Sequence, residues 1–397
     1  MNRLHVLILC PAERFGGAEV YLVGLIEALG AAGHRVTAVV GTEVHHRLAA
    51  LPRAASATLV EDNDVVWDWS VGPVENIQRQ QAMLAGLLDR LPSTVDVVPF
   101  VNLNWLSVGT GLLAELTARR LASVALVHLC PHPIDLTDAE RMILRASMRG
   151  PVRWVCVSRD NRFFIADSLR APEGDIRVVH NGPANTATLD DAALAERRGQ
   201  RPALRARYGF KEQDRIVLTV GRHDTQKGFE EAIAVLRDVA RVEPDIRYVW
   251  VGGGRCSALH EALVRHNRLQ NLVTLVEETD QVDDYFLLAD LFYFPTKYEG
   301  FSLALVEAAS FGLPIIANDV SSVGELLDGE LSRGLCRTAW HWQHVECMVE
   351  MLRLPPEQRA AIGTATRARA KSFSRDHMYS RMMDIINKSR DSHEQAD

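Results

Sequence analysis

Short apolar runs rich in β-branched residues alternate with longer amphipathic segments along most of this chain. In the first half the runs are HVLILC, RVTAVVG, VDVVPFVN, SVALVHLC, WVCVS and IRVVHN. Between them, segments such as GAEVYLVGLIEALGAAG repeat apolar residues at three-to-four spacing, as helices packed on a sheet must. This βαβ rhythm predicts a parallel sheet covered by helices.

The rhythm stops after residue 185 and then starts again. A polar stretch without strand character is followed by RIVLTVG, IRYVWVGGG, LVTLVE, LFYFPT and PIIAND. Because 397 residues exceed one ordinary hydrophobic core, we expect an α/β chain with two doubly wound, Rossmann-like domains. We place them at 1–185 and 186–372, followed at 373–397 by a C-terminal helix and the polar tail KSRDSHEQAD, which we expect to be disordered. The pattern leaves open whether this last part crosses back to the N-terminal domain.

The bulk properties exclude several classes of protein. A formal net charge of −7 argues against nucleic acid as a partner, because phosphate backbones are normally bound by a basic excess. The six cysteines lie far apart and predict reduced thiols. The first apolar run is too short for a signal peptide, and no run is long enough to span a bilayer. We therefore expect a cytoplasmic protein, with peripheral contact at the inner face of the membrane left open.

The most informative stretch, KYEGFSLALVEAASFGLPIIAND, directly follows the predicted strand LFYFPT. Gly300 permits a tight turn, and Ser302 suits the N-cap of a helix whose free N–H groups attract phosphate. Glu299 precedes this helix and Glu307 lies about one turn inside it, and a carboxylate can accept hydrogen bonds from two sugar hydroxyls. The alternative is that Glu307 is a solvated helix residue and Glu299 a loop charge. The residues alone leave the two interpretations about even.

Two further clusters follow predicted strands. In VLTVGRHDTQKGFEEAI, Arg222 and Lys227 flank a turn beside a helix start, which suits a diphosphate. Two unrelated surface cations are the commoner explanation for such a pair taken alone. In PAERFGGAEVYLV, Gly16 and Gly17 allow a ligand to approach the backbone closely. This spacing is not the GxGxxG of a nicotinamide-binding enzyme.

Taken in order and in their strand–turn–helix contexts, these clusters resemble the retaining, nucleotide-sugar-dependent glycosyltransferases with the GT-B fold, the large "glycosyl transferases group 1" family. The resemblance covers nearly the whole chain. It implies two Rossmann-like domains that face each other across a cleft. Its motifs are GGAE at 16–19, VALVHLC with His128, VVHNG at 178–182, GRHDTQKG at 221–228 and EGFSLALVE at 299–307.

The resemblance implies a role for each matching residue. Arg222 and Lys227 would hold the donor diphosphate, Glu307 the ribose, and Glu299 the hydroxyls of the transferred sugar. His128 matches a histidine that borders the reacting sugar. The implied catalytic set is Glu299, His128, Arg222 and Lys227, and the implied donor contacts come in addition from Gly16, Gly17, Gly300, Phe301, Ser302, Leu303 and Glu307.

Three positions qualify the match. His132 lies four residues after His128 and is an alternative for the same role. The family often has glycine where this chain has Ser302, and often histidine where it has Asn102. The Asn102 position belongs to the half that handles acceptors, so the acceptor of any one relative does not transfer to this chain.

Neither histidine pair suggests a metal site. Pro131 and the preceding strand exclude the helix that a zinc motif spanning His128 and His132 would need. His341 and His344 are expected to have structural or surface roles. We expect no metal and no cofactor, because cations and helix ends can neutralise the donor diphosphate.

A basic run lies just after the expected domain boundary. It suits a solvated face better than a site for an anionic acceptor or a lipid headgroup. No segment combines the apolar and basic faces that firm interfacial insertion requires. The run consists of Arg197, Arg198, Arg201, Arg205, Arg207 and Lys211.

The expected reaction is transfer of a sugar, with retention, from a nucleoside-diphosphate sugar to a hydroxyl. UDP-sugars are favoured as donors over GDP-sugars, and the acceptor is a sugar, a lipid-linked glycan or a small molecule. Two alternatives remain open: a noncatalytic nucleotide-sugar-binding relative, and an epimerase or phosphorylase of the same fold. A nicotinamide-dependent oxidoreductase is disfavoured because its fingerprint is missing.

Overall fold

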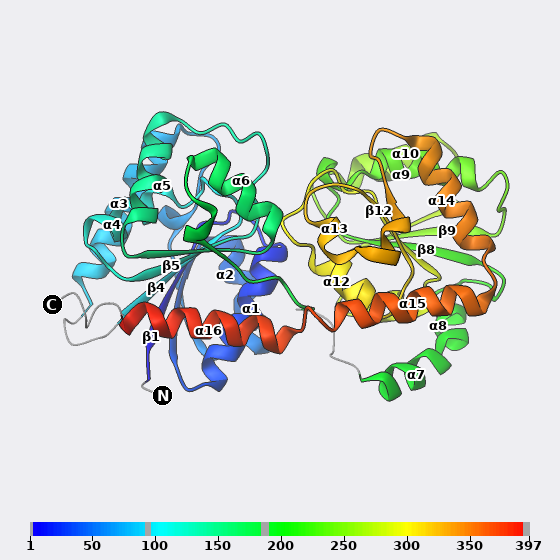
Figure 1. The fold of residues 1–397 in the computed structure, drawn as a ribbon, viewed down its shortest axis with the longest axis horizontal. Coiled ribbons are helices and arrows are strands. Elements are labelled where there is room, and N and C mark those ends of the chain that lie inside the picture. The colour runs from blue at the N-terminus through cyan, green and yellow to red at the C-terminus, as the bar shows by residue number, and fades with distance from the viewer. Residues whose placement is uncertain (1–2, 92–96, 184–189, 392–397) are drawn as a thin grey trace. The chain divides into compact units, whose positions relative to one another are not determined.

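The computed structural model describes residues 3–91, 97–183 and 190–391, and it divides into two compact units (Figure 1). The first unit comprises Met1–Ala184 and Arg375–Asp397, and the second comprises Asn185–Ser374. The expected boundary between residues 185 and 186 lies outside the described residues.

The first unit alternates strands with helices from its first strand to its seventh. Its elements are β1 (His5–Cys10), α1 (Gly17–Ala31), β2 (Arg35–Val40), α2 (Thr42–Ala49), β3 (Ala57–Glu61), α3 (Pro73–Asp89), β4 (Val97–Leu103), α4 (Thr110–Ala118), β5 (Ser123–Val127), α5 (Asp138–Arg149), β6 (Val152–Cys156), α6 (Arg159–Leu169), β7 (Ile176–Val178) and, from the end of the chain, α16 (Arg375–Asp391).

The second unit begins with two helices and then alternates in the same way. Its elements are α7 (Asp191–Gly199), α8 (Arg201–Arg207), β8 (Arg215–Val220), α9 (Phe229–Val239), β9 (Ile246–Val251), α10 (Ser257–His266), β10 (Val273–Val276), α11 (Val282–Leu288), β11 (Leu291–Phe294), α12 (Leu303–Ser310), β12 (Ile315–Asn318), α13 (Val323–Leu326), β13 (Leu335–Cys336), α14 (His341–Arg353) and α15 (Pro356–Ala370).

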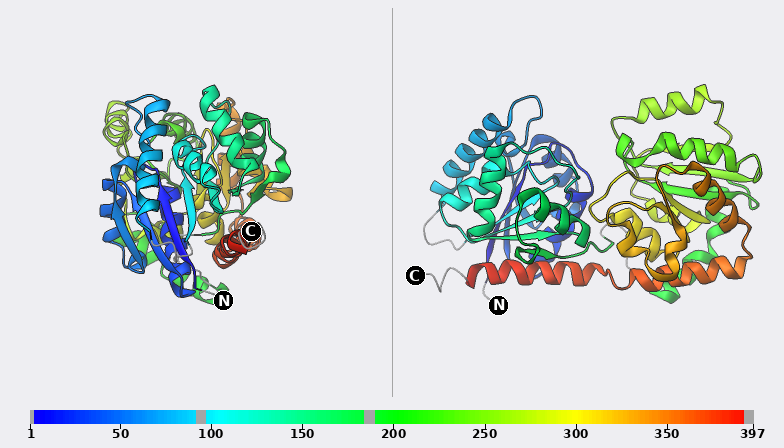
Figure 2. Two further views of the ribbon diagram at one scale, coloured as in Figure 1. Left: turned by 90° about the vertical axis from the view of Figure 1, so that its left-hand side faces the viewer. Right: turned by 45° about the horizontal axis from the view of Figure 1, so that its top comes forward.

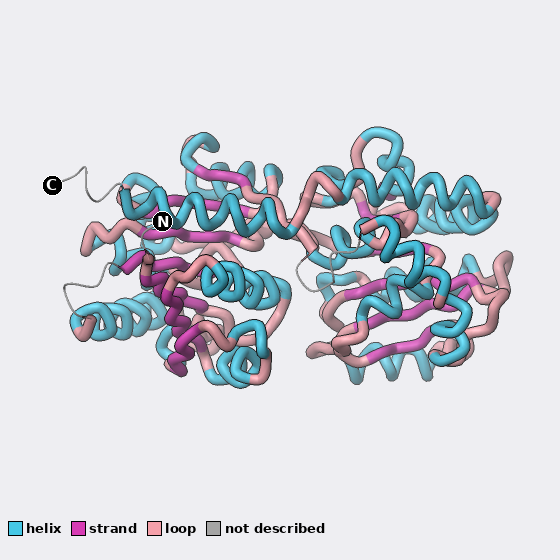
Figure 3. Tube along the Cα trace, turned by 90° about the horizontal axis from the view of Figure 1, so that it is seen from below, coloured by secondary structure: helices cyan, strands magenta, loops and turns pink. Residues whose placement is uncertain are grey.

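Each unit contains one parallel sheet. The strand order is β3-β2-β1-β4-β5-β6-β7 in the first unit and β10-β9-β8-β11-β12-β13 in the second. In the first sheet, Ile8 lies opposite Ala38 of β2 and Phe100 of β4, so β1 is a central strand with a hydrogen-bonded neighbour on each side. Figure 3 shows helices on both sides of the strands in each unit. Parallel strands need this cover because their side chains are apolar on both faces.

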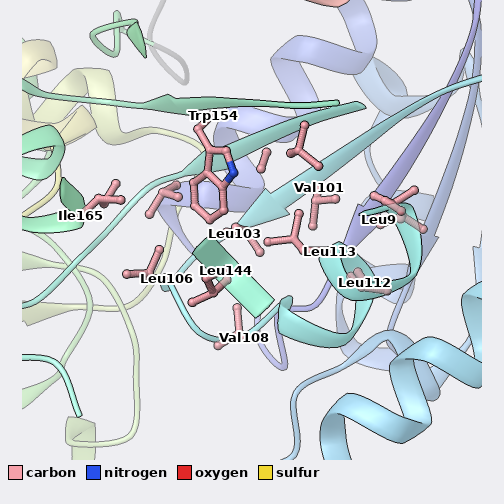
Figure 4. Close-up of a cluster of buried hydrophobic side chains, with 14 of the residues drawn as sticks. Leu9, Val101, Leu103, Leu106, Val108, Leu112, Leu113, Leu144, Trp154 and Ile165 are labelled. Atoms are coloured by element: carbon pink, nitrogen blue, oxygen red, sulfur yellow. The ribbon is translucent and has the colours of Figure 1, made fainter. Parts of the chain in front are cut away.

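The core of the first unit lies between its sheet and the helices that follow β3, β4 and β5. Trp154 on β6 is 1% exposed, and Leu103 and Leu113 belong to the same buried cluster. Figure 4 shows the Trp154 indole among these leucine and valine side chains. Such burial of aromatic and branched side chains is the main stabilising contribution to a domain of this size.

Helix α16 belongs to the first unit although it ends the chain (Figure 2). It packs against α1, where the Tyr379 hydroxyl donates a hydrogen bond to the Tyr21 carbonyl at 3.0 Å. A Cβ added at Gly24 would lie 2.0 Å from that hydroxyl. Glycine therefore allows the close approach of the two helices.

Three details differ from the sequence-based expectation. Strand β3 was not predicted, since its residues are only partly buried and give a weak apolar signal. Strand β13 has two residues, which is too short for any periodic pattern. Helix α16 continues through Asp391, so the first four residues of the expected tail are helical. The other six, 392–397, lie outside the described residues.

Candidate active site

Two strand-to-helix loops meet in the second unit at the carboxyl ends of β8 and β11, which are neighbours in the sheet. One loop runs from Gly221 to Gly228, and the other from Pro295 to Ser302. Gly228 has a φ of +74°, and a Cβ there would lie 2.1 Å from the Pro295 carbonyl oxygen. Both the left-handed backbone and the close approach require glycine at this position.

Side-chain amides hold these two loops together. A backbone bond helps, in which the Gln226 main-chain carbonyl accepts from the Lys297 backbone N–H at 2.8 Å. The Gln226 side chain donates to the Tyr298 carbonyl at 2.7 Å. Asn318, at the end of β12, donates to the carbonyls of residues 295 and 296 at 2.9 and 2.7 Å. These buried bonds fix the path of the backbone that carries the candidate site.

Lys227 and Glu299 form an ion pair where the loops meet, although they are 72 residues apart in the chain. Their side chains are only 13% and 9% exposed. The same carboxylate oxygen of Glu299 accepts a hydrogen bond from the Thr296 hydroxyl at 2.8 Å. Removing either partner would leave a poorly solvated charge, so each stabilises the other in this position. The Lys227 cation and the Glu299 carboxylate, which can accept hydrogen bonds from hydroxyls, are thereby fixed side by side at the sheet edge.

Arg222 lies in the exposed part of the same loop. Asp224, two residues on, accepts a hydrogen bond from the Gln226 backbone N–H at 3.2 Å and pairs with Arg255 at 3.1 Å. Burial raises the pKa of Asp224, but these bonds outweigh it and hold the pKa below its usual value. Asp224 therefore remains a carboxylate that shapes the turn.

Helix α12 begins as the sequence predicted. The Ser302 hydroxyl accepts a hydrogen bond from the Leu305 backbone N–H at 3.3 Å, which confirms the N-cap. Glu307 on this helix is 4% exposed and Glu299 is 8% exposed. The alternative that Glu307 is a solvated helix residue is therefore wrong, and Glu299 is a loop charge that is buried and paired with Lys227. Gly300 and Phe301 are buried, and Phe301 packs on Phe373 with ring centroids 5.0 Å apart. Leu303, also predicted from the resemblance, is the first residue of α12.

Sequence reasoning missed two parts of this region. The Gly-Gly-Gly stretch after β9 packs against the 221–228 loop, and a Cβ at Gly252 would lie 2.3 Å from the Gly221 carbonyl oxygen. Its position directly after a strand was a signal that could have identified it. Ser321, with a φ of +47°, accepts a hydrogen bond from the Glu299 backbone N–H at 3.3 Å. No pattern in the sequence marks this contact.

In the first unit, Gly16 and Gly17 lie at the start of α1, after β1. Gly16 is the N-cap, and its backbone N–H donates to the Glu19 carboxylate at 2.8 Å. Glu19 is 2% exposed. A buried carboxylate in the first turn is stabilised by the helix dipole and fixes the entry of the chain into α1. The predicted glycine turn therefore forms the N-terminal cap of α1.

His128 follows β5 at the same edge and is bonded to Asn102 at the end of β4. Asn102 donates its amide N–H to the Ala18 carbonyl at 3.3 Å, so its oxygen faces His128 Nε2 at 2.9 Å. Nε2 must then carry the proton. Burial lowers the pKa of His128 to about 3, so the ring is neutral. Its Nδ1 keeps a lone pair, for which the described residues offer no hydrogen bond.

His132 lies apart from this group. It is exposed, its ring stacks on Phe164 of α6 with centroids 4.7 Å apart, and its Nε2 lies 3.3 Å from the Asp167 carboxylate. Of the two histidines, only His128 is joined to the ends of β4 and β5 by hydrogen bonds within the described residues.

The basic run at 197–211 is only in part the solvated face that we expected, since Arg207 and Lys211 are exposed but Arg205 is buried. Arg197 pairs with Asp283 at 2.9 Å, and Arg201 and Arg205 both pair with Asp290 at 2.6 Å. Several of these guanidinium groups also donate to carbonyl oxygens at the end of α11. The arginines of the run therefore hold α7 and α8 against the rest of the second unit. Guanidinium groups can do this because they donate to the carbonyls that helix ends leave without a partner.

The remaining sequence-based expectations concern cysteines, histidines, metals and membranes. The six cysteines are free. His344 is buried and lies 3.2 Å from the Tyr293 hydroxyl, whereas His341 is exposed and pairs with Asp238 at 2.8 Å, so one has the expected structural role and the other the expected surface role. Over residues 3–91, 97–183 and 190–391, no cluster of three or more potential metal ligands occurs. Over those same ranges no helix has the length and apolarity to cross a membrane.

Each of the two Rossmann-like units has a glycine turn and a helix start at its strand ends, and the second also has a buried ion pair, which is the architecture of a GT-B protein. Family models agree with this class in both units. The model described as "Glycosyltransferase Family 4" matches residues 15–183, and that described as "Glycosyl transferases group 1" matches residues 200–369. The chain belongs to the group 1 glycosyltransferases.

Individual relatives are distant. A D-inositol 3-phosphate glycosyltransferase of Segniliparus rotundus is 28% identical over 184 residues, which are 45% of this chain and 41% of that protein. A protein of the same name from Jonesia denitrificans is 25% identical over 94% of this chain and 92% of its own length. The chain spans about two fifths of the length of several relatives that it matches, the Segniliparus protein among them. The structure of HepE of Anabaena with UDP-glucose has a TM-score of 0.76 at 14% identity, over 97% of this chain and 100% of HepE.

Proposed function

We propose that this protein transfers a sugar from a nucleoside-diphosphate sugar to an acceptor hydroxyl. The observation that carries the proposal is the Lys227–Glu299 pair at the carboxyl ends of β8 and β11, beside the start of α12. This edge offers a cation and helix N–H groups for a diphosphate, and carboxylates for sugar hydroxyls. Each of these groups lies in the second unit, so the donor site is assigned there.

Donor binding exchanges the partners of the ion pair. Before binding, Lys227 and Glu299 neutralise each other. The diphosphate then accepts hydrogen bonds from Lys227 and Arg222, and a sugar hydroxyl donates to Glu299. Thr296 keeps its bond to Glu299 and holds the carboxylate in orientation while this exchange takes place. The buried Glu307 is assigned to the ribose hydroxyls of the nucleotide.

The transfer itself exchanges one bond at the anomeric carbon for another. The bond from this carbon to the diphosphate oxygen breaks, and a bond to the acceptor oxygen forms. The acceptor proton passes to the leaving diphosphate. Arg222, Lys227 and the N–H groups at the start of α12 stabilise the charge that develops on the leaving group. Retention of configuration is proposed from the family resemblance, and His128 is assigned to a hydroxyl near the reacting sugar.

UDP-sugars are the proposed donors, with GDP-sugars as the alternative. The similarity to HepE, solved with UDP-glucose, supports the first choice. A thermal-shift series with UDP, GDP, ADP, dTDP and their sugar conjugates, without and then with Mg²⁺, tests the donor site. One nucleotide should stabilise the protein selectively, by about 2.7 kcal/mol at a hundredfold excess over its Kd. No shift with any nucleotide at millimolar concentration would contradict the proposal.

Turnover of the selected donor then tests the residues. Lys227→Ala and Glu299→Gln should each lower turnover by about a hundredfold or more, as removal of one group that stabilises transition-state charge does. Lys297→Ala is the matched control, since Lys297 is close in sequence but pairs with Glu231 at 2.8 Å and is 41% exposed. Near-normal turnover in either site variant, with an intact fold by circular dichroism, would refute the assignment.

A further inference from the structure

The loop at residues 66–72 of the first unit presents an exposed tryptophan on a buried one. Trp69 is 61% exposed, whereas Trp67 is 4% exposed. Their ring centroids lie 6.3 Å apart in an edge-to-face arrangement. An exposed indole is a large, flat apolar surface on which the apolar face of a ligand can pack.

The loop that carries Trp69 is held in place by hydrogen bonds on both sides. The fully buried Asn76 accepts from the Asp68 backbone N–H and donates to the Asp68 carbonyl, both at 2.8 Å. Arg79 donates to the Val66 carbonyl at 2.7 Å. The Ser70 backbone N–H donates to the Asp68 carboxylate at 2.8 Å. Trp69 therefore projects from a preorganised loop, which lowers the entropy cost of binding a ligand.

This loop lies at the same edge of the sheet as Gly16 and Gly17. It follows β3, whose carboxyl end lies at the same edge as that of β1 because the strands are parallel. The Trp67 backbone N–H donates to the carbonyl of Pro11, the first residue after β1, at 3.1 Å. The segment from Pro11 leads directly to Gly16 and Gly17. Open α/β sheets bind their ligands at this edge.

The charges around Trp69 select the kind of ligand. The only cation between residues 61 and 79, Arg79, is within 3.9 Å of two of the carboxylates in that segment. An anionic ligand is disfavoured by the excess of acid, whereas hydroxyl groups find acceptors there. The acidic residues of the segment are Glu61, Asp62, Asp64, Asp68 and Glu75.

We propose that Trp69 is a stacking platform for a sugar ring of a neutral glycan. The apolar C–H face of the ring packs on the indole, and hydroxyls at its rim donate to carboxylates of the 61–79 segment. That this glycan is the acceptor rests on the proposed transferase function. The binding surface itself does not, since it is built entirely from residues of the first unit.

The experiment measures binding of the labelled full-length protein to a glycan array that carries neutral, sialylated and sulfated oligosaccharides. Four proteins are compared: wild type, Trp69→Ala, Trp69→Tyr and Trp342→Ala. Trp342 is the matched control because it is 55% exposed but lies in the second unit. The same four proteins are tested for stabilisation by UDP and GDP.

Wild type should bind neutral glycans, and Trp69→Ala should weaken that binding about tenfold or more, as loss of one aromatic stack does. Trp69→Tyr should retain most of the affinity, and Trp342→Ala all of it. The proposal is overturned if wild type binds no glycan or only anionic ones, or if Trp69→Ala binds like wild type. Nucleotide stabilisation reports separately on the transferase: glycan binding without it refutes the function but not the platform.

Discussion

Replacing Arg205 tests whether the basic run of the second unit is structural. Arg205 lies on α8 and is 8% exposed. Its guanidinium donates to the Leu288, Glu212 and Asp214 carbonyls at 3.0 to 3.1 Å and to the Asp290 carboxylate at 2.6 Å. It thus joins α8 to the end of α11 and to the start of β8.

The expected cost follows from what Arg205→Met leaves behind. Removing one partner of a buried ion pair costs about 3–5 kcal/mol, because the other charge stays buried. Here Asp290 keeps a bond from Arg201 at 2.6 Å and one from the Ile216 backbone N–H at 2.8 Å. The carbonyls that lose a donor add about 1 kcal/mol each where they stay dry. We therefore expect a loss of about 2–4 kcal/mol in the free energy of unfolding.

Urea denaturation combined with hydrogen exchange measures this loss. Hydrogen exchange is needed because a chain with two units does not unfold in one step. In Arg205→Met the backbone exchange rate should rise first at residues 201–215 and 286–291. Arg207→Met is the control, since that guanidinium is 59% exposed and should cost no more than about 0.5 kcal/mol. A loss below about 1 kcal/mol for Arg205→Met, or equal losses in the two variants, would refute a structural role.

Three further outcomes are expected. Gly228→Ala should destabilise the second unit by about 1–3 kcal/mol in urea denaturation, since its Cβ would meet the Pro295 carbonyl oxygen at 2.1 Å; a neutral effect would contradict the close approach. Nitrogen NMR should show His128 as the Nε2–H tautomer at pH 7, and Asn102→Ala should lose that preference; an Nδ1–H tautomer in the wild type would contradict the orientation of Asn102. The melting temperature should fall as the pH decreases from about 6.5, because an unfolded histidine takes up a proton there. Folded His128, with its pKa lowered to about 3 by burial, does not, so a flat profile between pH 4 and 6.5 would contradict its burial.

Periodicity predicted those elements that are long and buried. Strands β1 and β8 are six residues each and mostly buried, so their apolar runs stand out in the sequence. The unpredicted β3 is partly exposed and β13 has two residues, so neither leaves a pattern. Register and strand order depend on pairings between distant segments, which no local pattern records.

The candidate site was predictable only as far as chain position determines it. Residues that follow parallel strands share one edge, which brings the segments of Lys227 and Glu299 together. Their direct pairing, and the bond from Thr296, depend on loop conformations that Gly228 and Asn318 fix through distant carbonyls. The basic run shows the opposite error: Arg201 and Arg205 look solvated in sequence, because the Leu288 carbonyl that binds both lies more than 80 residues away.

The strand-end groups of the two units are suited to different ligands. In the second unit the central groups are charged and paired, and under the proposed function the donor supplies both a replacement anion for Lys227 and hydroxyls for Glu299. A nucleoside-diphosphate sugar has both, whereas a free sugar or a free phosphate has only one. In the first unit, His128 is neutral, Asn102 is uncharged and Trp69 is apolar. Such groups gain little from an anion, so under the proposed function we assign them to hydroxyls and C–H faces of the sugars rather than to the diphosphate.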